Sequence, residues 1–245
     1  MHKKMKTRFT IFTLLFLFNF SFGQSNKYYM NKLGNIIDQQ KYDQQKNNSL
    51  EKIQKNMKSM QIVEDLNELY SRNDSIVYSY AWHFTDTPKK IIKEIERKKA
   101  IIGKEYPIES ETTLDGKQIS LNEIKGKPTL INLWFTSCAP CIEEMPVLNE
   151  LKSKYGEKFN FLSITMDSES KVKKLLEKHK FEFTHIVNSK KLTTKLGFNS
   201  YPVNLFLDKN GVVKIIEGNV NYTFVDGELK MGDGMEFIQI LEKLL

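Results

Sequence analysis

Only two of the 245 residues are cysteines, Cys138 and Cys141. Without further cysteines the chain cannot carry the framework of several disulfides that holds many small secreted domains together. A disulfide between residues three apart closes a short loop and removes little conformational entropy from the unfolded chain. The pair is therefore better explained by redox chemistry than by stabilisation of the fold.

Long apolar runs are scarce as well. The first such run extends over 14 residues, Phe9 to Phe22, between a basic start and Gly23-Gln24-Ser25, and beyond residue 23 no run is long enough to cross a membrane. It fits the apolar part of a signal peptide and is shorter than the roughly 20 residues that span a bilayer. We expect residues 1–23 to be an export signal, with an uncleaved membrane anchor as the alternative. No cysteine lies near the cleavage point, which excludes attachment of a lipid there.

A strong charge of one sign is also lacking. The net charge of +7 includes Lys3, Lys4, Lys6 and Arg8, and it falls to +3 without residues 1–23. That surplus is small and scattered, whereas nucleic-acid-binding domains concentrate basic residues in a patch or stripe. We therefore expect no nucleic-acid partner, and contact with a membrane only if the N-terminal segment is retained.

Glycine and proline are rare in residues 24–101, which contain only Gly34 and Pro88. Thr87-Pro88 offers an N-cap followed by proline at the first position of a helix. The segment Asp74–Phe84 fits either a strand or a buried helix. We interpret residues 24–101 as a small, mostly helical N-terminal module of unassigned role. The main evidence is an apolar spacing typical of one helix face, at Leu50, Ile53, Met57, Met60, Val63, Leu66 and Leu69.

From residue 102 onward, strand-like and helix-like segments alternate. This alternation predicts an α/β domain over residues 102–245, with a central sheet flanked by helices and made mixed by a final antiparallel hairpin. Residues 219–234 are loop-like and stay unassigned. The expected strands are Thr129–Phe135, Phe159–Met166, Phe183–Val187, Val203–Asp208 and Val212–Glu217, and the expected helices are Ile142–Lys154, Ser168–His179, Lys191–Leu196 and Met235–Leu245.

The Cys-x-x-Cys pair lies where the apolar strand ending at Phe135 gives way to the helix of residues 142–154. The free N–H groups and the dipole at a helix N-terminus stabilise a thiolate, so the first cysteine becomes an attacking sulfur. We expect Cys138 to be the exposed nucleophile. Cys141, one turn into the helix, would resolve the mixed disulfide that Cys138 forms with a substrate.

Other uses of Cys-x-x-Cys fit less well. A zinc site would need His179 and His185, but 37 residues separate Cys141 from His179, and the two histidines fall on different elements. Attachment of haem needs a histidine directly after the second cysteine, where Ile142 stands. Delivery of copper would favour the spacing Cys-x₃-Cys, which this pair does not have. We expect neither a metal nor a cofactor.

The second half resembles the thioredoxin superfamily, and within it the exported TlpA/ResA-type thiol-disulfide oxidoreductases. The resemblance covers about residues 102–245 and does not extend to residues 24–101. The chain departs from the family pattern at two positions. Ser137 stands immediately before the first cysteine, where family members often carry an aromatic residue, and the Phe that is common two residues after Pro107 is missing. Both differences concern substrate contacts and the reduction potential. The motifs that carry the resemblance are Gly103-Lys104 with Pro107, Leu114-Asp115-Gly116-Lys117, Leu121 with Lys125-Gly126-Lys127-Pro128, Asn132 to Cys141, Glu143-Glu144-Met145-Pro146 and Ser200-Tyr201-Pro202.

The resemblance also implies roles for residues around the pair. In thioredoxin a buried Asp lies six residues before the first cysteine, where this chain has Asn132, which does not titrate. The resemblance offers Glu144 as the base for Cys141 instead, three residues later on the same helix face, with a solvated glutamate as the alternative. It further implies a cis Pro202 that holds the Tyr201 backbone beside Cys138 for binding an extended substrate. The dipeptide Ala139-Pro140 would tune the relative stability of thiolate and disulfide.

The function that the resemblance implies is thiol-disulfide exchange by an exported, periplasmic enzyme that acts on protein disulfides, as a reductant rather than an oxidant. Its partners would be disulfide-containing client proteins and a membrane thiol electron donor. A peroxiredoxin-like thiol peroxidase is the first alternative, because it uses the same fold and Thr136 lies near Cys138. A non-catalytic metal- or client-binding protein on the same scaffold is the alternative of another class.

Overall fold

The computed structural model describes residues 25–31, 34–225 and 228–245, so the expected export signal lies outside the described residues. The chain divides into two compact units, Met1–Asp86 and Thr87–Leu245. The helix α2 (Pro88–Ile101) therefore groups with the second unit, although the sequence analysis assigned it to the N-terminal module. In the described part of the chain, no helix is long and apolar enough to cross a membrane.

Among its described residues, the first unit forms a four-stranded sheet with one helix, so the expectation of a mostly helical module is wrong. Its strands are β1 (Asn26–Met30), β2 (Ile36–Asp38), β3 (Gln61–Arg72) and β4 (Ser75–Thr85), in the order β2-β1-β4-β3, and its helix is α1 (Gln39–Gln54). The pairs β1–β2 and β3–β4 are antiparallel, and β1 runs parallel to β4.

The apolar spacing from Leu50 to Leu69 misled because two elements share it. The helix α1 ends at Gln54, Met57 and Met60 lie in the connecting segment, and Val63, Leu66 and Leu69 belong to β3, which pairs with the aromatic strand β4. Only Asn73 and Asp74 separate these strands, and Asn73 has a φ of 51°. Asparagine tolerates this left-handed conformation, which tight hairpin turns require.

Aromatic side chains join α1 to the sheet. The ring of Tyr42 on α1 is 1% exposed and stacks on Tyr29 of β1, with centroids 3.8 Å apart. It also lies edge-on to Tyr80, at 4.9 Å. The Tyr42 hydroxyl donates a hydrogen bond to Glu64 and accepts one from Trp82 Nε1 at 2.9 Å. The core of this small unit therefore depends on one tyrosine whose polar end is fully paired.

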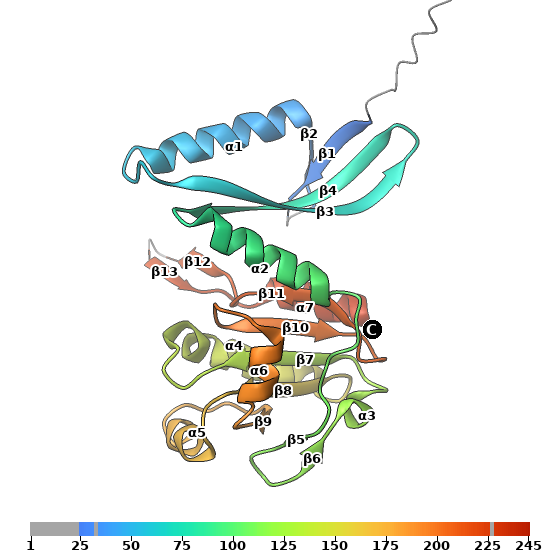
Figure 1. The fold of residues 1–245 in the computed structure, drawn as a ribbon, viewed down its shortest axis with the longest axis vertical. Helices are drawn as coiled ribbons and strands as arrows, with labels where there is room; N and C mark the ends of the chain where they lie inside the picture. The colour runs from blue at the N-terminus through green and yellow to red at the C-terminus, as the bar shows by residue number, and fades with distance from the viewer. Residues whose placement is uncertain (1–24, 32–33, 226–227) are drawn as a thin grey trace, which may run out of the picture. The chain divides into compact units, whose positions relative to one another are not determined.

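The second unit has the thioredoxin-like α/β architecture that the sequence predicted. Its five-stranded mixed sheet has the order β11-β10-β7-β8-β9 (Figure 1). The strands β7, β8 and β9 are parallel, and β10 and β11 are antiparallel to their neighbours. The strands are β7 (Thr129–Trp134), β8 (Asn160–Thr165), β9 (Thr184–Ile186), β10 (Val203–Leu207) and β11 (Val213–Glu217).

Alternate residues of the central strand β7 enter two separate cores. Leu130 and Trp134 pack with α4 (Ala139–Tyr155) and α7 (Met235–Leu244) on one face. Ile131 and Leu133 pack with α3 (Leu121–Ile124) and α6 (Lys190–Leu196) on the other face. The helix α5 (Glu169–Leu176) contributes Val172 to the first core. Burial on both faces explains why β7 is a continuous apolar run.

Two small hairpins complete the second unit. The strands β5 (Glu111–Thr112) and β6 (Gln118–Ile119) pair antiparallel across the segment that contains Asp115-Gly116, where Gly116 has a φ of 82°. The strands β12 (Tyr222–Val225) and β13 (Glu228–Met231) pair within the segment that the sequence left unassigned.

We expect Tyr42→Ala to destabilise the first unit, because it removes the ring that α1 places against β1 and β4. The expected loss in the free energy of unfolding is about 3–5 kcal/mol, as for other large buried aromatic residues. Hydrogen exchange of the whole chain, followed by mass spectrometry, should show faster exchange in β1, β3 and β4 and unchanged exchange in β7 and β8.

Tyr70→Ala is the matched control, since Tyr70 lies in β3 but is 53% exposed. Surface substitutions of this kind usually change stability by about 0.5 kcal/mol or less. Equal effects of the two substitutions would contradict the importance assigned to the aromatic cluster.

Candidate active site

The Cys138–Cys141 pair lies at the start of α4, directly after the central strand β7. Cys138 is the N-cap residue of α4, with extended backbone, and its N–H donates to the Phe135 carbonyl at 3.1 Å. Pro140 occupies the first turn, where a missing N–H costs no helical hydrogen bond. This placement at the positive end of the helix dipole favours a thiolate on Cys138 once the pair is reduced.

The two cysteines form a disulfide, with their Cα atoms 5.3 Å apart. Cys141 is fully buried and Cys138 is only 4% exposed, so the expectation of an exposed nucleophile is wrong for this oxidised state. Both cysteines belong to the first core, against which the partly buried side chains of Phe135, Ile142 and Tyr201 pack. A reaction partner can therefore reach the disulfide only through the small exposed surface at Cys138.

Tyr201 and Pro202 directly precede β10, and the Tyr201 side chain packs against the core that contains both cysteines. The peptide bond between them is cis, as the resemblance implied, and β10 begins at the next residue, Val203. Val203 is paired with Leu133 of β7, which brings this loop to the end of β7 where the motif begins. The rings of Tyr201 and Phe135 meet edge to face, with centroids 5.4 Å apart.

Glu144 is a fully buried carboxylate one turn after Cys141. Its Oε1 accepts a hydrogen bond from Asn132 Nδ2 at 2.8 Å, and its Oε2 accepts one from the Val220 N–H at 3.0 Å. Asn204 Nδ2 is 3.4 Å from both carboxylate oxygens. The alternative of a solvated glutamate is therefore wrong. The neighbouring Glu143 is exposed and accepts a hydrogen bond from the Tyr222 hydroxyl.

Burial raises the pKa of Glu144 from 4.5 to about 7, although the hydrogen bonds from Val220, Asn204 and Asn132 oppose the shift. Desolvation penalises the charged carboxylate more than these donors stabilise it. At neutral pH both protonation states are therefore populated. A carboxyl group in this condition can accept a proton from a neighbour or return one.

Two buried asparagines on adjacent strands hold this carboxylate. Asn132 of β7 and Asn204 of β10 are paired in register, and Asn132 Nδ2 also donates to Asn204 Oδ1 at 2.9 Å. Asn204 Nδ2 donates to the Gly218 carbonyl at 2.8 Å. The sequence analysis noted Asn132 as a residue that cannot titrate, and it missed Asn204 and Val220. Asn204 could have been found as the polar residue inside the apolar strand 203–207. Val220 acts through its backbone N–H, so nothing in the local sequence marked it.

The loop before Cys138 is held from the neighbouring strand. Asp167, just after β8, accepts hydrogen bonds from the Thr136 N–H at 2.7 Å and from the Thr136 hydroxyl at 2.8 Å. Within the motif itself, Ser137 and Ala139 are exposed and Pro140 is partly exposed. The sequence analysis missed Asp167, whose position at the carboxyl end of a parallel strand was the available sign.

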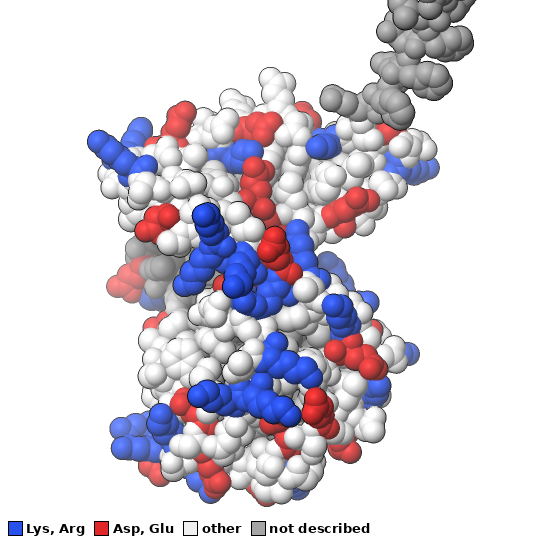
Figure 2. Space-filling view, in the orientation of Figure 1, with Lys and Arg blue, Asp and Glu red and all other residues white. Residues whose placement is uncertain are grey.

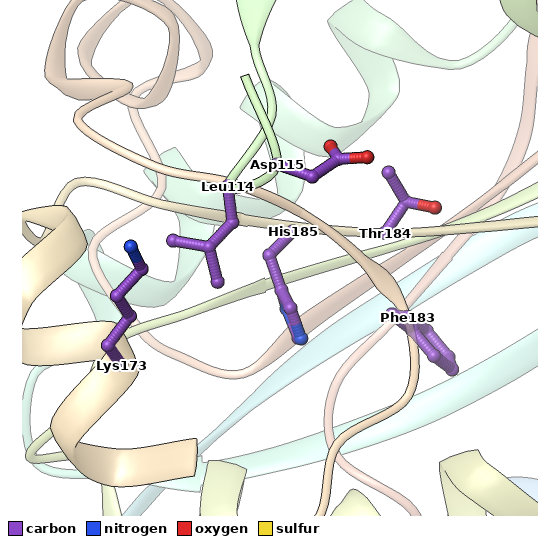
Figure 3. Close-up of a pocket in the computed structure, with 6 residues that line it drawn as sticks. All are labelled: Leu114, Asp115, Lys173, Phe183, Thr184 and His185. Carbon is purple, nitrogen blue, oxygen red and sulfur yellow. The ribbon is translucent and has the colours of Figure 1, made fainter. Parts of the chain in front are cut away.

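His185 lines a cavity of about 460 Å³ that includes neither cysteine. Its other lining residues are Leu114, Asp115, Lys173, Phe183 and Thr184 (Figure 3). The Nε2 atom of His185 is 2.9 Å from the Phe181 carbonyl and its Nδ1 is 2.5 Å from the Ser163 hydroxyl. Because a carbonyl only accepts, Nε2 carries the hydrogen and Nδ1 accepts from Ser163. Burial lowers the pKa of His185, which favours this neutral form. Both ring nitrogens are thus engaged, and the described residues contain no cluster of three or more potential metal ligands.

The raised pKa of Glu144 predicts that stability depends on pH. Between about pH 4.5 and pH 7, the folded protein keeps a proton on Glu144 that the unfolded chain releases. The free energy of unfolding should therefore fall as pH rises through this window, by on the order of 3 kcal/mol. Urea unfolding of the oxidised protein across this pH range should show a smaller fall in the free energy of unfolding for Glu144→Gln, because glutamine does not titrate.

Glu143→Gln is the control for this experiment, because Glu143 is the exposed neighbour on the same helix turn. It should leave the pH dependence of the wild type in place. If Glu144→Gln showed the full decline, the carboxyl group of Glu144 would not be the group responsible.

Comparison with known proteins agrees with this geometry. The AhpC/TSA family matches residues 102–216. The thiol-disulfide oxidoreductase ResA of Bacillus anthracis is 34% identical over 139 residues, which are 55% of this chain and 80% of ResA. The thioredoxin-like protein YneN of Bacillus subtilis is 31% identical over 118 residues, 46% of this chain and 69% of YneN.

Among solved structures, a putative thiol:disulfide interchange protein DsbE from Chlorobium tepidum is 21% identical, with a TM-score of 0.49. The match covers 59% of this chain and 98% of that protein. The similarity to ResA covers 80% of ResA's own length at 34% identity. The chain therefore belongs to the thioredoxin superfamily and is a thiol-disulfide oxidoreductase of the ResA/TlpA type.

Proposed function

We propose that the protein is exported and reduces disulfides of client proteins, with Cys138 as the nucleophile, Cys141 as the resolving cysteine and Glu144 as the base. The observation that carries these roles is the buried carboxylate one turn after Cys141, in the same core as both cysteines. A thiol at a fully buried position is hard to deprotonate without such a group.

The exchange proceeds in two steps. The Cys138 thiolate attacks one sulfur of the client disulfide, which forms a mixed disulfide and releases the other client sulfur as a thiolate. Glu144 then accepts the proton of Cys141, whose thiolate attacks Cys138 and releases the second client sulfur. The client gains two electrons, and the enzyme is left with the Cys138–Cys141 disulfide, the state seen here.

Only 4% of Cys138 is exposed and Cys141 is buried, so Cys138 is the point of contact for the client and for the recharging partner alike. A reductant needs to be recharged by one dedicated partner, which for an exported enzyme is a membrane thiol donor. Tyr201 packs against the core that contains Cys138, and its backbone and that of the cis Pro202 could pair with an extended client segment.

A thiol peroxidase is less well supported by the site. Such an enzyme would use Thr136 to bind the peroxide, but the Thr136 hydroxyl already donates to Asp167 at 2.8 Å. A peroxide-reducing cysteine also has no need of a partner two residues away, nor of a base beside that partner.

Substitution of the two cysteines should separate the two steps. We expect Cys138→Ser to abolish reduction of insulin, because it removes the attacking sulfur. Cys141→Ser should form the mixed disulfide and fail to release it, so a covalent adduct should accumulate on a non-reducing gel. Glu144→Gln should slow release by about a hundredfold or more, as for loss of a general base.

Glu143→Gln is the control, since Glu143 is exposed and has no assigned role in either step. Unchanged turnover by Cys138→Ser would overturn the mechanism. Consumption of peroxide that survives Cys141→Ser would support the peroxidase alternative instead.

The direction of electron flow is open to direct measurement. We expect the Cys138–Cys141 couple to have a reduction potential below about −200 mV, nearer to thioredoxin than to strong oxidants such as DsbA. Titration of the purified protein against glutathione or dithiothreitol buffers, with the redox state read by thiol alkylation, gives this value. A potential near about −120 mV would make the protein an oxidant and overturn the proposed direction.

A further inference from the structure

The helix α2 carries a concentration of positive charge that the sequence analysis had described as scattered. It contains five lysines, one arginine and two glutamates, a net charge of +4. Figure 2 shows Lys and Arg side chains gathered over this helix. The helix directly precedes residues 102–216, which the AhpC/TSA family matches.

The helix lies against the loop that leads to the cis proline. The Ser200 hydroxyl donates a 2.5 Å hydrogen bond to Glu94 of α2. One turn away, the guanidinium group of Arg97 packs on Gly197, where a Cβ atom would lie 3.1 Å from Arg97 Nε. Gly197 has a φ of 68° as the C-cap of α6, so the loop approaches α2 at a position that favours glycine.

A continuous series of contacts connects this loop with the redox pair. Ser200 precedes Tyr201, whose ring lies on Phe135, and the Phe135 carbonyl accepts the N–H of Cys138. A client segment bound beside Cys138 and the cis Pro202 would therefore extend toward α2. The part of the client that reaches the helix would be the sequence flanking its reactive cysteine.

Three lysines near the start of α2 do not stabilise the helix itself, unlike Lys98 and Lys99 in its last turn. Lys89 and Lys90 lie in its first turn, which holds no acidic residue, and Lys93 follows in the next turn. Cations are unfavourable near a helix N-terminus, by about 0.3–1 kcal/mol each. All three are exposed, and none forms a salt bridge with a residue of the described ranges. On α5, by contrast, Lys171 and Lys173 are paired with Asp167 and Glu169.

We propose that α2 forms an electrostatic docking surface for clients whose reactive cysteine is flanked by acidic residues. The proposal rests on the proposed reduction of client disulfides. The exposed Lys89, Lys90 and Lys93 attract the acidic flank, and the positive end of the helix dipole adds to this attraction. Glu94 and Arg97 hold the helix beside the loop of the cis proline. Such a surface acts on the rate of productive encounter more than on the chemical steps.

The test compares two disulfide-bonded peptides that differ only in their flanks, which are aspartates in one and asparagines in the other. We expect K89E/K90E/K93E to lower kcat/KM for the acidic peptide about tenfold or more at low salt. The loss should shrink at high salt, where the charges are screened. Activity on the neutral peptide and on hydroxyethyl disulfide should stay unchanged.

The matched control is K127E/K158E/K209E, which changes the net charge equally. These three lysines are exposed and adjoin the ends of β7, β8 and β10 that lie opposite the redox pair. Equal effects of the two triple variants, or no effect of either, would overturn the docking surface. The docking surface would also be overturned if the α2 lysines bound anionic phosphatidylserine vesicles while K89E/K90E/K93E left the peptide kinetics unchanged. Failure of the wild type to reduce hydroxyethyl disulfide would instead overturn the proposed function.

Discussion

The burial of the Glu144 carboxylate is the constraint on which the redox site depends. Its donors come from β7, β10 and the segment after β11, so the central strands and the C-terminal segment meet at one pair of oxygen atoms. Such a group is tolerated in a core only when hydrogen bonds replace its lost hydration. Two asparagines inside otherwise apolar strands supply this compensation while leaving the pKa near neutrality.

The same core controls access to sulfur. The helix α4 places Cys138 at its N-terminus, where a thiolate is stabilised, and the packing of Phe135 and Tyr201 leaves little of the disulfide exposed. Reactivity and access are thus separate properties of the site. Reactivity follows from the helix, while access follows from two aromatic side chains, one before the motif and one before the cis proline.

The N-terminal half shows where periodicity fails as a guide. The apolar steps from Leu50 to Leu69 fit a helix, but α1 ends at Gln54, and from Gln61 the chain forms β3, which pairs with the aromatic strand β4. Strand pairing is a long-range interaction that local spacing does not reveal. The charge of α2 was visible in the sequence, and its contact with the loop at Gly197 and Ser200 was not.

The sequence by itself determined the family, the α/β architecture of the second unit and the identity of the redox pair, because these depend on short motifs and on buried strands that are mostly apolar. The family resemblance also pointed to Glu144 as the base for Cys141. Only the tertiary structure decided that Glu144 is buried, that Asn204 and Val220 hold it, and that Cys138 is barely exposed. These properties arise where segments distant in sequence meet, and desolvation exists only in the assembled core.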